Sequence, residues 1–396
     1  MPPSEVNRRN PTQQSPSSAP KVLLISASVG AGHNAAARAL LETISAVAPH
    51  LDVTLIDSLD FTSRWFRAKY AGLYALAVSR FPRLYGLGYA LTDRPKGAGR
   101  TLVERWRLWS ERRALGKLAD YVRRLQPDLI VHTHFLAPSV LWDLSSRGEL
   151  KARQLVVTTD VQPHRWWYCK GVEHWFTGQE VGQDRLRGFA VDAGRITVSG
   201  IPIHPKWPRA LPQREELLAR WSLPADKKIV LLSGGTDFTC GPVLRIARGL
   251  AGSPADVCLV VLAGRNKRLL ARLSKLPEVR SGRVVPMGFT DRLNELSQVA
   301  SLMVTKAGGL TTAECLSKST PMVFLKPVPG QERVNAEFFA GRGAGLIVRN
   351  PAQVVQTVCR LLDSPAELDE MARNAGQLYR PGARTITEFI CRLVSS

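Results

Sequence analysis

The chain has 396 residues, of which 44% are hydrophobic and 22% are charged, and its formal net charge is +21. This length exceeds a single typical core, so we expect two domains, and the composition is that of a soluble globular protein rather than a disordered one. No run of about 18 or more apolar residues appears, which excludes a helix that spans a bilayer. The excess of positive charge indicates a polyanionic partner, which leaves nucleic acid, an anionic membrane and phosphorylated substrates open.

The N-terminus, residues 1–20, is rich in Pro, Ser, Asn and Gln and contains no apolar segment. We expect a disordered tail here rather than a signal peptide. The six cysteines form no C-x-x-C pair and show no metal-ligand spacing, which fits a reducing cytoplasm.

Short apolar runs alternate with helical patterns along both halves of the chain. Those of the first half cover residues 22–25, 53–57, 129–131 and 155–157, and those of the second half cover residues 229–232, 257–262, 284–285, 302–304 and 322–325. Alternation of this kind predicts α/β domains with doubly wound parallel sheets, one in each half. Between the halves, the proline-rich segment 200–212 is typical of a linker.

A glycine-rich turn follows the first strand and opens a helix. Gly30, Gly32 and Ala35 fit the dinucleotide fingerprint G-x-G-x-x-G/A, and Asp57 ends the next strand, so an NAD(P)-dependent oxidoreductase is one alternative. A turn without chemistry is another. His33 favours a catalytic turn, because an imidazole can accept a proton near neutral pH at the mouth of a cleft.

The second half carries two further glycine turns, each directly after a strand. Their amides and the dipole of the following helix suit a diphosphate, and the residues we assign to the turns are Ser233, Gly234, Gly235, Gly308, Gly309, Leu310 and Thr311. Glu314 lies about one turn into the second of these helices, where its carboxylate can accept hydrogen bonds from ribose hydroxyls. Gln331 and Glu332, with Asn335 one turn later, form a polar cluster suited to sugar hydroxyls.

Taken together, three stretches closely resemble the monogalactosyldiacylglycerol synthase and processive diacylglycerol glucosyltransferase family. They are S-V-G-A-G-H at 28–33, T-K-A-G-G-L-T-T-A-E at 305–314 and P-V-P-G-Q-E-x-x-N at 327–335. The resemblance extends from about residue 21 to 348. One departure is Ser319, where the family commonly has Gly, so a different local turn is expected there.

The resemblance implies a GT-B architecture, in which two Rossmann-like domains face a cleft. It places the acceptor and the membrane in residues 21–205 and the UDP-sugar in 206–378, and it implies that the C-terminal helix, 379–396, crosses back to the first domain. By motif position Glu314 is similar to the ribose ligand of the family, Gln331 and Glu332 to the hexose ligands, and Asn335 to their support. His33 resembles the catalytic histidine, and the remaining acceptor-side residues are Gly30, Gly32, Asp160, His164 and Trp167.

The mechanism that these residues imply is an inverting transfer from a UDP-sugar without a cofactor. His33 would deprotonate the attacking hydroxyl, and Asp160 is either the alternative base or a partner that makes His33 more basic. No D-x-D motif or His/Asp cluster appears, so no metal ion is implied. The helix N-termini would stabilise the charge on UDP as it leaves. Arg265, after the strand 257–262, either contacts the diphosphate or lies on the surface.

Between the second strand and Pro127, basic residues are mixed with Trp and Tyr. Cations beside indole rings suit a membrane interface, and the residues we assign to it are Trp65, Arg67, Lys69, Trp106, Arg107 and Trp109. Solvated charges on a helix packed against the domain are the plain alternative, and nucleic-acid binding is another. We therefore expect a peripheral enzyme on the inner face of the plasma membrane that transfers glucose or galactose to diacylglycerol, with an oxidoreductase and a nucleic-acid-binding protein as alternatives. The sequence does not decide between glucose and galactose.

Overall fold

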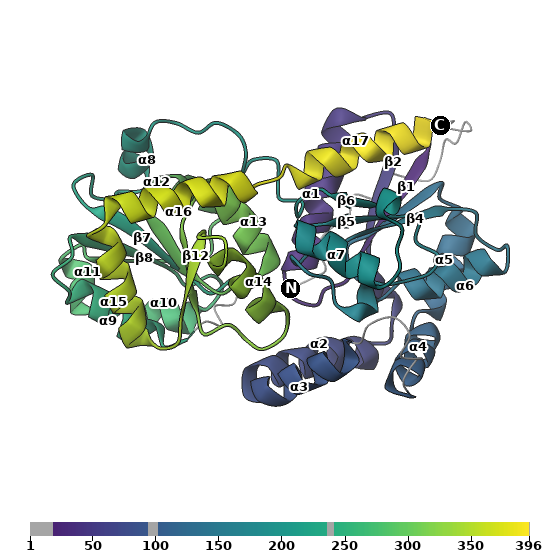
Figure 1. The fold of residues 1–396 in the computed structure, drawn as a ribbon, viewed down its shortest axis with the longest axis horizontal. Coiled ribbons are helices and arrows are strands. Elements are labelled where there is room, and N and C mark those ends of the chain that lie inside the picture. Colours follow the sequence, from purple (N-terminus) through teal and green to yellow (C-terminus); the bar gives the residue numbers. More distant parts are fainter. Residues whose placement is uncertain (1–18, 94–101, 236–240, 396) are drawn as a thin grey trace.

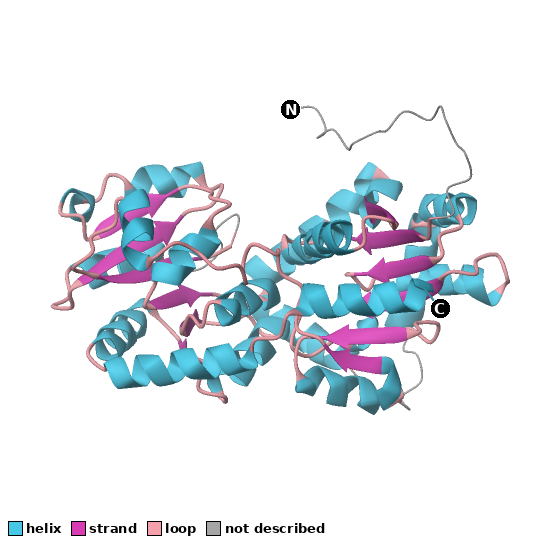
Figure 2. Ribbon diagram, turned by 90° about the horizontal axis from the view of Figure 1, so that it is seen from above, coloured by secondary structure: helices cyan, strands magenta, loops and turns pink. Residues whose placement is uncertain are grey.

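The computed structural model describes residues 19–93, 102–235 and 241–395, which form two α/β domains side by side (Figure 1). Residues 1–18, most of the tail expected to be disordered, lie outside the described part of the chain. Each domain is built on a six-stranded parallel sheet with helices on both faces (Figure 2). This confirms the prediction of two doubly wound domains.

The sheet of the first domain has the strand order β2-β1-β3-β4-β5-β6. Its strands are β1 (Lys21–Ser26), β2 (Asp52–Asp57), β3 (Leu129–His132), β4 (Arg153–Val157), β5 (His174–Thr177) and β6 (Ile196–Val198). Its helices are α1 (Gly32–Val47), η1 (Ser58–Phe61), α2 (Arg64–Arg80), α3 (Pro82–Thr92), α4 (Leu102–Ala114), α5 (Gly116–Leu125), α6 (Pro138–Ser146), η2 (Arg165–Trp167), α7 (Glu180–Gly188) and η3 (Ala193–Arg195).

The sheet of the second domain has the order β12-β11-β10-β7-β8-β9. Its strands are β7 (Lys228–Ser233), β8 (Val257–Leu262), β9 (Val284–Met287), β10 (Leu302–Thr305), β11 (Met322–Leu325) and β12 (Gly345–Val348). Its helices are α8 (Arg214–Arg220), α9 (Val243–Ala251), α10 (Lys267–Leu273), α11 (Pro277–Arg280), α12 (Leu293–Val299), α13 (Gly309–Ser317), α14 (Gln331–Ala340), α15 (Pro351–Leu362) and α16 (Pro365–Leu378).

The apolar runs that predicted the strands are buried because helices cover both faces of each sheet. In β1, Leu23 and Ile25 face one core of the first domain, whereas Val22 and Leu24 face the other. Alternate side chains of a strand point to opposite faces, so one apolar run supplies two cores. The carboxyl ends of the parallel strands then share one edge of each sheet, where ligands bind in open α/β sheets.

The last helix, α17 (Gly382–Ser395), leaves the second domain and packs along α1 of the first (Figure 1). Its Ile386 and Ile390 are fully buried in the first-domain core. The chain passes between the domains twice, once after β6 and once before α17, and these two crossings meet. A Cβ on Gly382 would stand 2.4 Å from the carbonyl oxygen of Gly200. The two crossings are therefore in direct backbone contact, and glycine makes this approach sterically possible.

The proline-rich segment between β6 and α8 is packed rather than free. Ile201, Ile203 and Trp207 are buried and contact Ala313 of α13. The predicted boundary between residues 205 and 206 falls within this segment.

Between β2 and β3 the chain leaves the sheet and forms α2, α3 and α4, which lie below the first domain, with α2 and α3 extending toward the second (Figure 1). No helix among the described residues is both long enough and apolar enough to cross a membrane.

Candidate active site

The first glycine turn joins β1 to α1 and is held in place by Asp57. Gly30 has φ of +78°, a conformation that glycine adopts readily. The Asp57 carboxylate accepts hydrogen bonds from the amide and the hydroxyl of Ser28 and from the amide of Leu59, at 2.9 Å. In the dinucleotide reading Asp57 would bind a ribose, but here its oxygens hold the turn.

His33 lies in the first turn of α1, at the carboxyl edge of the first sheet, and is half-buried. Its Nδ1 lies 2.9 Å from the carbonyl oxygen of Thr133 and 3.0 Å from Oγ1 of Thr159. A carbonyl only accepts, so Nδ1 carries the hydrogen and Nε2 is left as the acceptor. Burial lowers the pKa of His33 to about 4, so the ring is neutral at pH 7 and able to accept a proton.

Asp160 follows β4 and meets the second domain. Its Oδ1 accepts a hydrogen bond of 3.0 Å from Nδ2 of Asn335. Burial raises the pKa of Asp160 to about 6, and the nearby Glu332 adds to the increase, whereas the hydrogen bond from Asn335 lowers it. Among the described residues, the groups that hydrogen-bond the His33 ring are the two threonines, so Asp160 is a second titratable group beside the histidine rather than its direct partner.

The two domains touch directly at the edge where these groups lie. A Cβ on Gly309 would stand 1.8 Å from the carbonyl oxygen of Thr159, so the start of α13 rests on the turn that leads to Asp160. Asn335 is fully buried, and besides Asp160 its amide contacts Val161 N at 3.1 Å and Ala307 O at 2.9 Å. The predicted support residue of the sugar ligands therefore joins the two halves of the site.

On the second domain both glycine turns lie at the carboxyl edge of the sheet. Ser233 ends β7, and Gly235 after it has φ of +82°. Gly308 is the N-cap of α13 and no side chain caps this helix, whose first turn contains Leu310 and Thr311. The first amides of such a helix have no intrahelical acceptor, and together with the helix dipole they form an anion site.

Lys306 is a cation between the two turns that sequence reasoning had not assigned to the site. Its Nζ lies 3.4 Å from a carboxylate oxygen of Glu332, and its Cε lies 3.5 Å from where a Cβ of Gly235 would stand. A lysine directly after a strand and before a glycine turn was the available signal, since the helix N-terminus and the cation attract the same anion.

Glu314 is one turn into α13 and half-buried. Burial raises the pKa of its carboxyl to about 8, although Lys206 and a hydrogen bond from Trp207 act in the opposite direction. About nine-tenths of this carboxyl is therefore protonated at pH 7. A ligand that donates hydrogen bonds to this carboxylate would favour its charged form.

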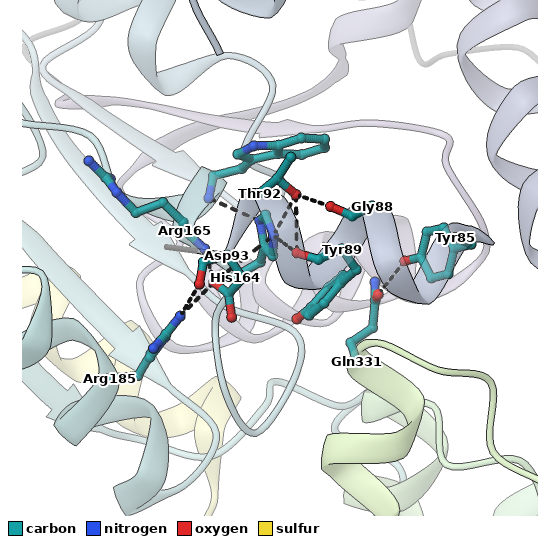
Figure 3. A network of polar contacts seen from close by, with 10 residues as sticks. Tyr85, Gly88, Tyr89, Thr92, Asp93, His164, Arg165, Arg185 and Gln331 are labelled. Atoms are coloured by element: carbon teal, nitrogen blue, oxygen red, sulfur yellow. Dashed lines mark hydrogen bonds and ion pairs between the residues drawn. The ribbon is translucent and has the colours of Figure 1, made fainter. Parts of the chain in front are cut away.

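Gln331 and Glu332 begin α14, after Gly330, whose φ is +109°. Glu332 accepts from the amide of Val328 at 3.4 Å in addition to its ion pair with Lys306. Gln331 contacts the first domain: its Oε1 accepts a hydrogen bond of 2.5 Å from the hydroxyl of Tyr85 in α3 (Figure 3).

The acceptor-side residues surround His33 and α3. Trp167 is buried with its ring centroid 6.0 Å from that of His33, and Gly32 is the first residue of α1 with open space around it. His164 holds the end of α3, since its Nε2 lies 3.2 Å from the carbonyl oxygen of Tyr89 (Figure 3). The Tyr89 ring in turn lies 4.5 Å from that of His164, and sequence reasoning had missed both Tyr85 and Tyr89.

The residues assigned to a membrane surface divide into two groups. Trp65, Trp106 and Trp109 are 65%, 67% and 57% exposed, and the ammonium of Lys69 lies 4.0 Å from the ring centroid of Trp65. Arg67 is half-exposed and paired with Asp60.

Arg107 differs from the prediction. Its guanidinium is turned inward, bonds both carboxylate oxygens of the buried Glu111 at 2.7 and 2.8 Å, and lies over the ring of Trp166. Arg107 is therefore half of a buried ion pair that fastens α4, because an uncompensated Glu111 would be costly there. Burial still raises the pKa of Glu111 to about 7, against the opposing effect of Arg107.

The structure also places Ser319, the one departure from the family pattern, and Arg265, whose role the sequence left open. Ser319 has φ of +52°, so the turn after α13 keeps the left-handed conformation that glycine would adopt there. Arg265 lies with its guanidinium 5.3 Å from the ring centroid of Phe289, which is 59% exposed.

Two family models match the chain, one in each domain. That of monogalactosyldiacylglycerol (MGDG) synthase matches residues 33–203, and that of the glycosyltransferase family 28 C-terminal domain matches residues 243–389. Over its two domains the chain is similar to monogalactosyldiacylglycerol synthases and to family 28 glycosyltransferases, and it is a glycosyltransferase. This glycosyltransferase is 26% identical over 362 residues to a protein of Bacillus cytotoxicus named processive diacylglycerol beta-glucosyltransferase, covering 91% of this chain and 90% of that one. It is 27% identical over 263 residues to the protein of that name from Bacillus subtilis, covering 66% and 68%.

Solved structures of low sequence identity share the fold of this glycosyltransferase. MurG of Acinetobacter baumannii aligns with a TM-score of 0.62 at 16% identity, covering 94% of this chain and 99% of that one. MnaA of S. aureus, solved with UDP, aligns with a TM-score of 0.62 at 15% identity, covering 95% and 97%. HepE of Anabaena, solved with UDP-glucose, aligns with a TM-score of 0.53 at 15% identity, covering 95% and 99%. The GT-B architecture implied by the sequence is thereby confirmed.

Proposed function

We propose that this glycosyltransferase transfers glucose or galactose from a UDP-sugar to the hydroxyl of diacylglycerol at an anionic membrane surface, with inversion at the anomeric carbon. One observation carries the proposal. The start of α13, suited to a diphosphate, rests on the Thr159–Asp160 turn beside His33, so a donor and a general base would meet at one edge. The names of the Bacillus relatives support diacylglycerol as the acceptor.

The UDP-sugar would bind mainly to the second domain. The amides of Gly309 and Leu310 in the uncapped first turn of α13 and the ammonium of Lys306 would face the diphosphate. Glu314 would accept hydrogen bonds from the ribose. The neighbours of the same fold that were solved with UDP and UDP-glucose support this nucleotide. Gln331 and Glu332 would hydrogen-bond the hexose.

The first domain would activate the acceptor. Nε2 of His33 accepts the proton of the lipid hydroxyl while the hydroxyl oxygen attacks the anomeric carbon from the face opposite the leaving group. The bond between the anomeric carbon and the diphosphate oxygen breaks with its electron pair going to UDP. A histidine with the Nδ1 hydrogen bond seen here is already the tautomer that this step needs. Donors fixed before the reaction stabilise the charge on UDP without reorganising.

The surface formed by α2, α3 and α4 would bring the cleft to the bilayer. Its exposed large apolar residues are Trp65, Leu73, Leu76, Phe81, Leu84, Leu87, Leu91, Leu102, Val103, Trp106 and Trp109. Arg113 and Lys69 lie beside the exposed rings of Trp109 and Trp65. Exposed indoles flanked by cations match the headgroup level of an anionic membrane, where each cation contributes about 1 kcal/mol.

The nucleotide is tested first by thermal unfolding with UDP, UDP-glucose, UDP-galactose and NAD. A ligand that binds only the folded state raises its stability, by about 2.7 kcal/mol at a hundred times its Kd. We expect the three UDP compounds to stabilise the protein and NAD to have no effect. Stabilisation by NAD alone would contradict the proposal and favour an oxidoreductase.

The transfer itself is tested with anionic vesicles that contain diacylglycerol and with either labelled UDP-glucose or labelled UDP-galactose. Chromatography of the lipid extract should show a labelled glycolipid from one donor. If folded, vesicle-bound protein labels no lipid from either donor, then diacylglycerol or the hexose is wrong.

A further inference from the structure

Helix α3 presents two different faces. Leu84, Leu87 and Leu91, at helical spacing, are 66%, 56% and 54% exposed. Tyr85 and Tyr89, one turn apart on another side of the helix, are half-buried and face the second domain. A single helix therefore carries an exposed apolar stripe on one side. On the other side it contacts residues 329–331 of the second domain, which we call the donor loop.

The contact with the donor loop is close at three points. Tyr85 donates its hydroxyl hydrogen bond to Gln331 at 2.5 Å (Figure 3). A Cβ on Gly86 would stand 2.4 Å from Cβ of Pro329, and one on Gly330 would stand 3.0 Å from the Tyr85 ring. Since the absent Cβ atoms are what permit this approach, the helix and the loop fit against each other without space between them.

On the other side α3 is fastened to its own domain. His164 holds the carbonyl of Tyr89, and Asp93, directly after the helix, accepts from the amide of Arg165 at 2.8 Å and pairs with Arg185 at 2.7 Å (Figure 3). The charged pair is largely buried, where such a bond is strong and directional. Helix α3 is therefore fixed to the first domain and contacts the donor loop of the second.

We infer that Tyr85 is a positioning residue for the donor hexose. Its hydroxyl fixes the carboxamide of Gln331, so that Oε1 is turned to the first domain and the Nε2 hydrogens remain to donate to a sugar oxygen. This inference rests on the proposed function, and adds that the hexose site is completed by a helix of the acceptor domain. The nucleotide itself does not depend on Tyr85, because the turns at Gly235 and Gly308 belong to the second domain.

Tyr85→Phe keeps the ring and removes the hydrogen bond. A neutral hydrogen bond of this kind corresponds to roughly a 2- to 10-fold change in an equilibrium constant. We expect the KM for the UDP-hexose to rise by about that factor and the Kd of UDP alone, measured by calorimetry, to remain unchanged. A role confined to stability would move both constants or neither.

Tyr121→Phe is the matched control, because Tyr121 lies in α5 with its ring 5.1 Å from Phe61 and packs against the first-domain core. Its KM and Kd should equal those of the wild type. If Tyr85→Phe and Tyr121→Phe behave alike, or if Tyr85→Phe weakens UDP as much as UDP-hexose, the inference is overturned.

A pair of glycines in α3 gives a second test that does not involve the tyrosine. Gly86→Ala would push against Pro329, whereas a Cβ on Gly88 meets nothing within 4 Å. Both changes add the same helix propensity. We expect Gly86→Ala to raise the KM for the UDP-hexose at least as much as Tyr85→Phe, and Gly88→Ala to leave it unchanged. Equal constants for the two alanine variants would contradict the inference.

The wild-type measurements separate the two levels of the proposal. Wild-type protein that binds UDP and transfers the hexose, together with unaffected Tyr85→Phe and Gly86→Ala variants, would remove only the role of α3. Wild-type protein that binds neither UDP nor a UDP-hexose would overturn the proposed function and this inference with it.

Discussion

In both domains the chain returns once from an outer strand to the middle of the sheet, but the connection differs between the two domains. In the second domain the chain passes from the outer strand β9 back to β10, beside β7, through α12. In the first domain the corresponding passage runs from β2 back to β3, beside β1, through α2, α3, α4 and α5. Helix α12 covers its own sheet with Leu296 and Val299 fully buried. The helices α2 to α4 project below the first domain and contact it only in part, for example through Phe66 and Tyr70 of α2 (Figure 1).

The surfaces of the two passages differ accordingly. Of the fourteen exposed large hydrophobic side chains among the described residues, eleven lie between residues 65 and 109. A soluble domain exposes single apolar residues freely, but a concentration of this kind marks an interaction site. The two sheets are thus common to both domains. The longer β2–β3 connection of the first domain, which we call the enlarged crossing, adds an apolar surface and a helix, α3, that contacts the donor loop.

The largest effect is expected when the proposed general base is removed from the first domain. His33→Ala should lower kcat by roughly 10²–10⁴-fold, because a positioned general base contributes about that much. Binding of UDP should be unchanged, since its turns lie on the second domain. The matched control is His50→Ala, an exposed histidine between α1 and β2. Turnover near that of the wild type in His33→Ala would move the base to Asp160.

A second change tests the apolar surface of the enlarged crossing. Trp106→Ala with Trp109→Ala removes two side chains that are 67% and 57% exposed. Each large side chain transferred from water contributes on the order of 1.5–3 kcal/mol, less at an interface, so binding to anionic vesicles should weaken by roughly a hundredfold. Phe289→Ala, equally exposed on the second domain, should bind vesicles as the wild type does in a co-sedimentation assay. Equal loss in both variants would refute a membrane surface confined to the first domain.

A third, smaller effect is the pH dependence of UDP binding on the second domain. Burial raises the pKa of Glu314 to about 8, so the carboxylate that would accept the ribose hydroxyls is roughly one-tenth ionised at pH 7 and nine-tenths at pH 9. Affinity for UDP should therefore increase with pH, by close to tenfold between these values. In calorimetry Glu314→Gln should bind UDP with little dependence on pH, and more weakly than the wild type at pH 9. Affinity of the wild type that falls over this range would contradict the ribose role.

The same shift in the pKa of Glu314 predicts how stability changes with pH. The folded state prefers the neutral carboxyl, whose ordinary pKa is 4.5, so this contribution to stability is complete below pH 4.5 and is lost as the pH rises to about 8. His33 acts in the opposite direction. Its folded pKa of about 4 lies below the ordinary 6.5, so its contribution is lost as the pH falls from 6.5 to 4.

Local features of the fold were accessible from the sequence. Apolar runs such as 22–25 and 229–232 predicted strands because parallel strands are buried on both faces. Glycine turns directly after strands marked the edge where Ser233 and Gly308 lie, because chain direction alone brings the carboxyl ends of parallel strands together. Ser319 shows the limit of single residues, since it keeps the left-handed turn that its identity argued against.

The contacts between the domains were not accessible from the sequence. Asp160 and Asn335 are 175 residues apart, and Tyr85 and Gln331 are 246 apart, so no local pattern relates them. The burial of Arg107 was missed for a different reason. A helix with arginines and tryptophans on all sides does not reveal which cation is turned inward until its partner, Glu111 four residues later, is seen to be buried.

The most direct test measures UDP released and glycolipid formed in the same reaction, with vesicles that contain or lack diacylglycerol. The account predicts one UDP for each hexose transferred to lipid, and little release of UDP without diacylglycerol, because the bond to the diphosphate would break when the hydroxyl attacks. Release of UDP that does not depend on diacylglycerol, with no hexose in the lipid extract, would contradict the account.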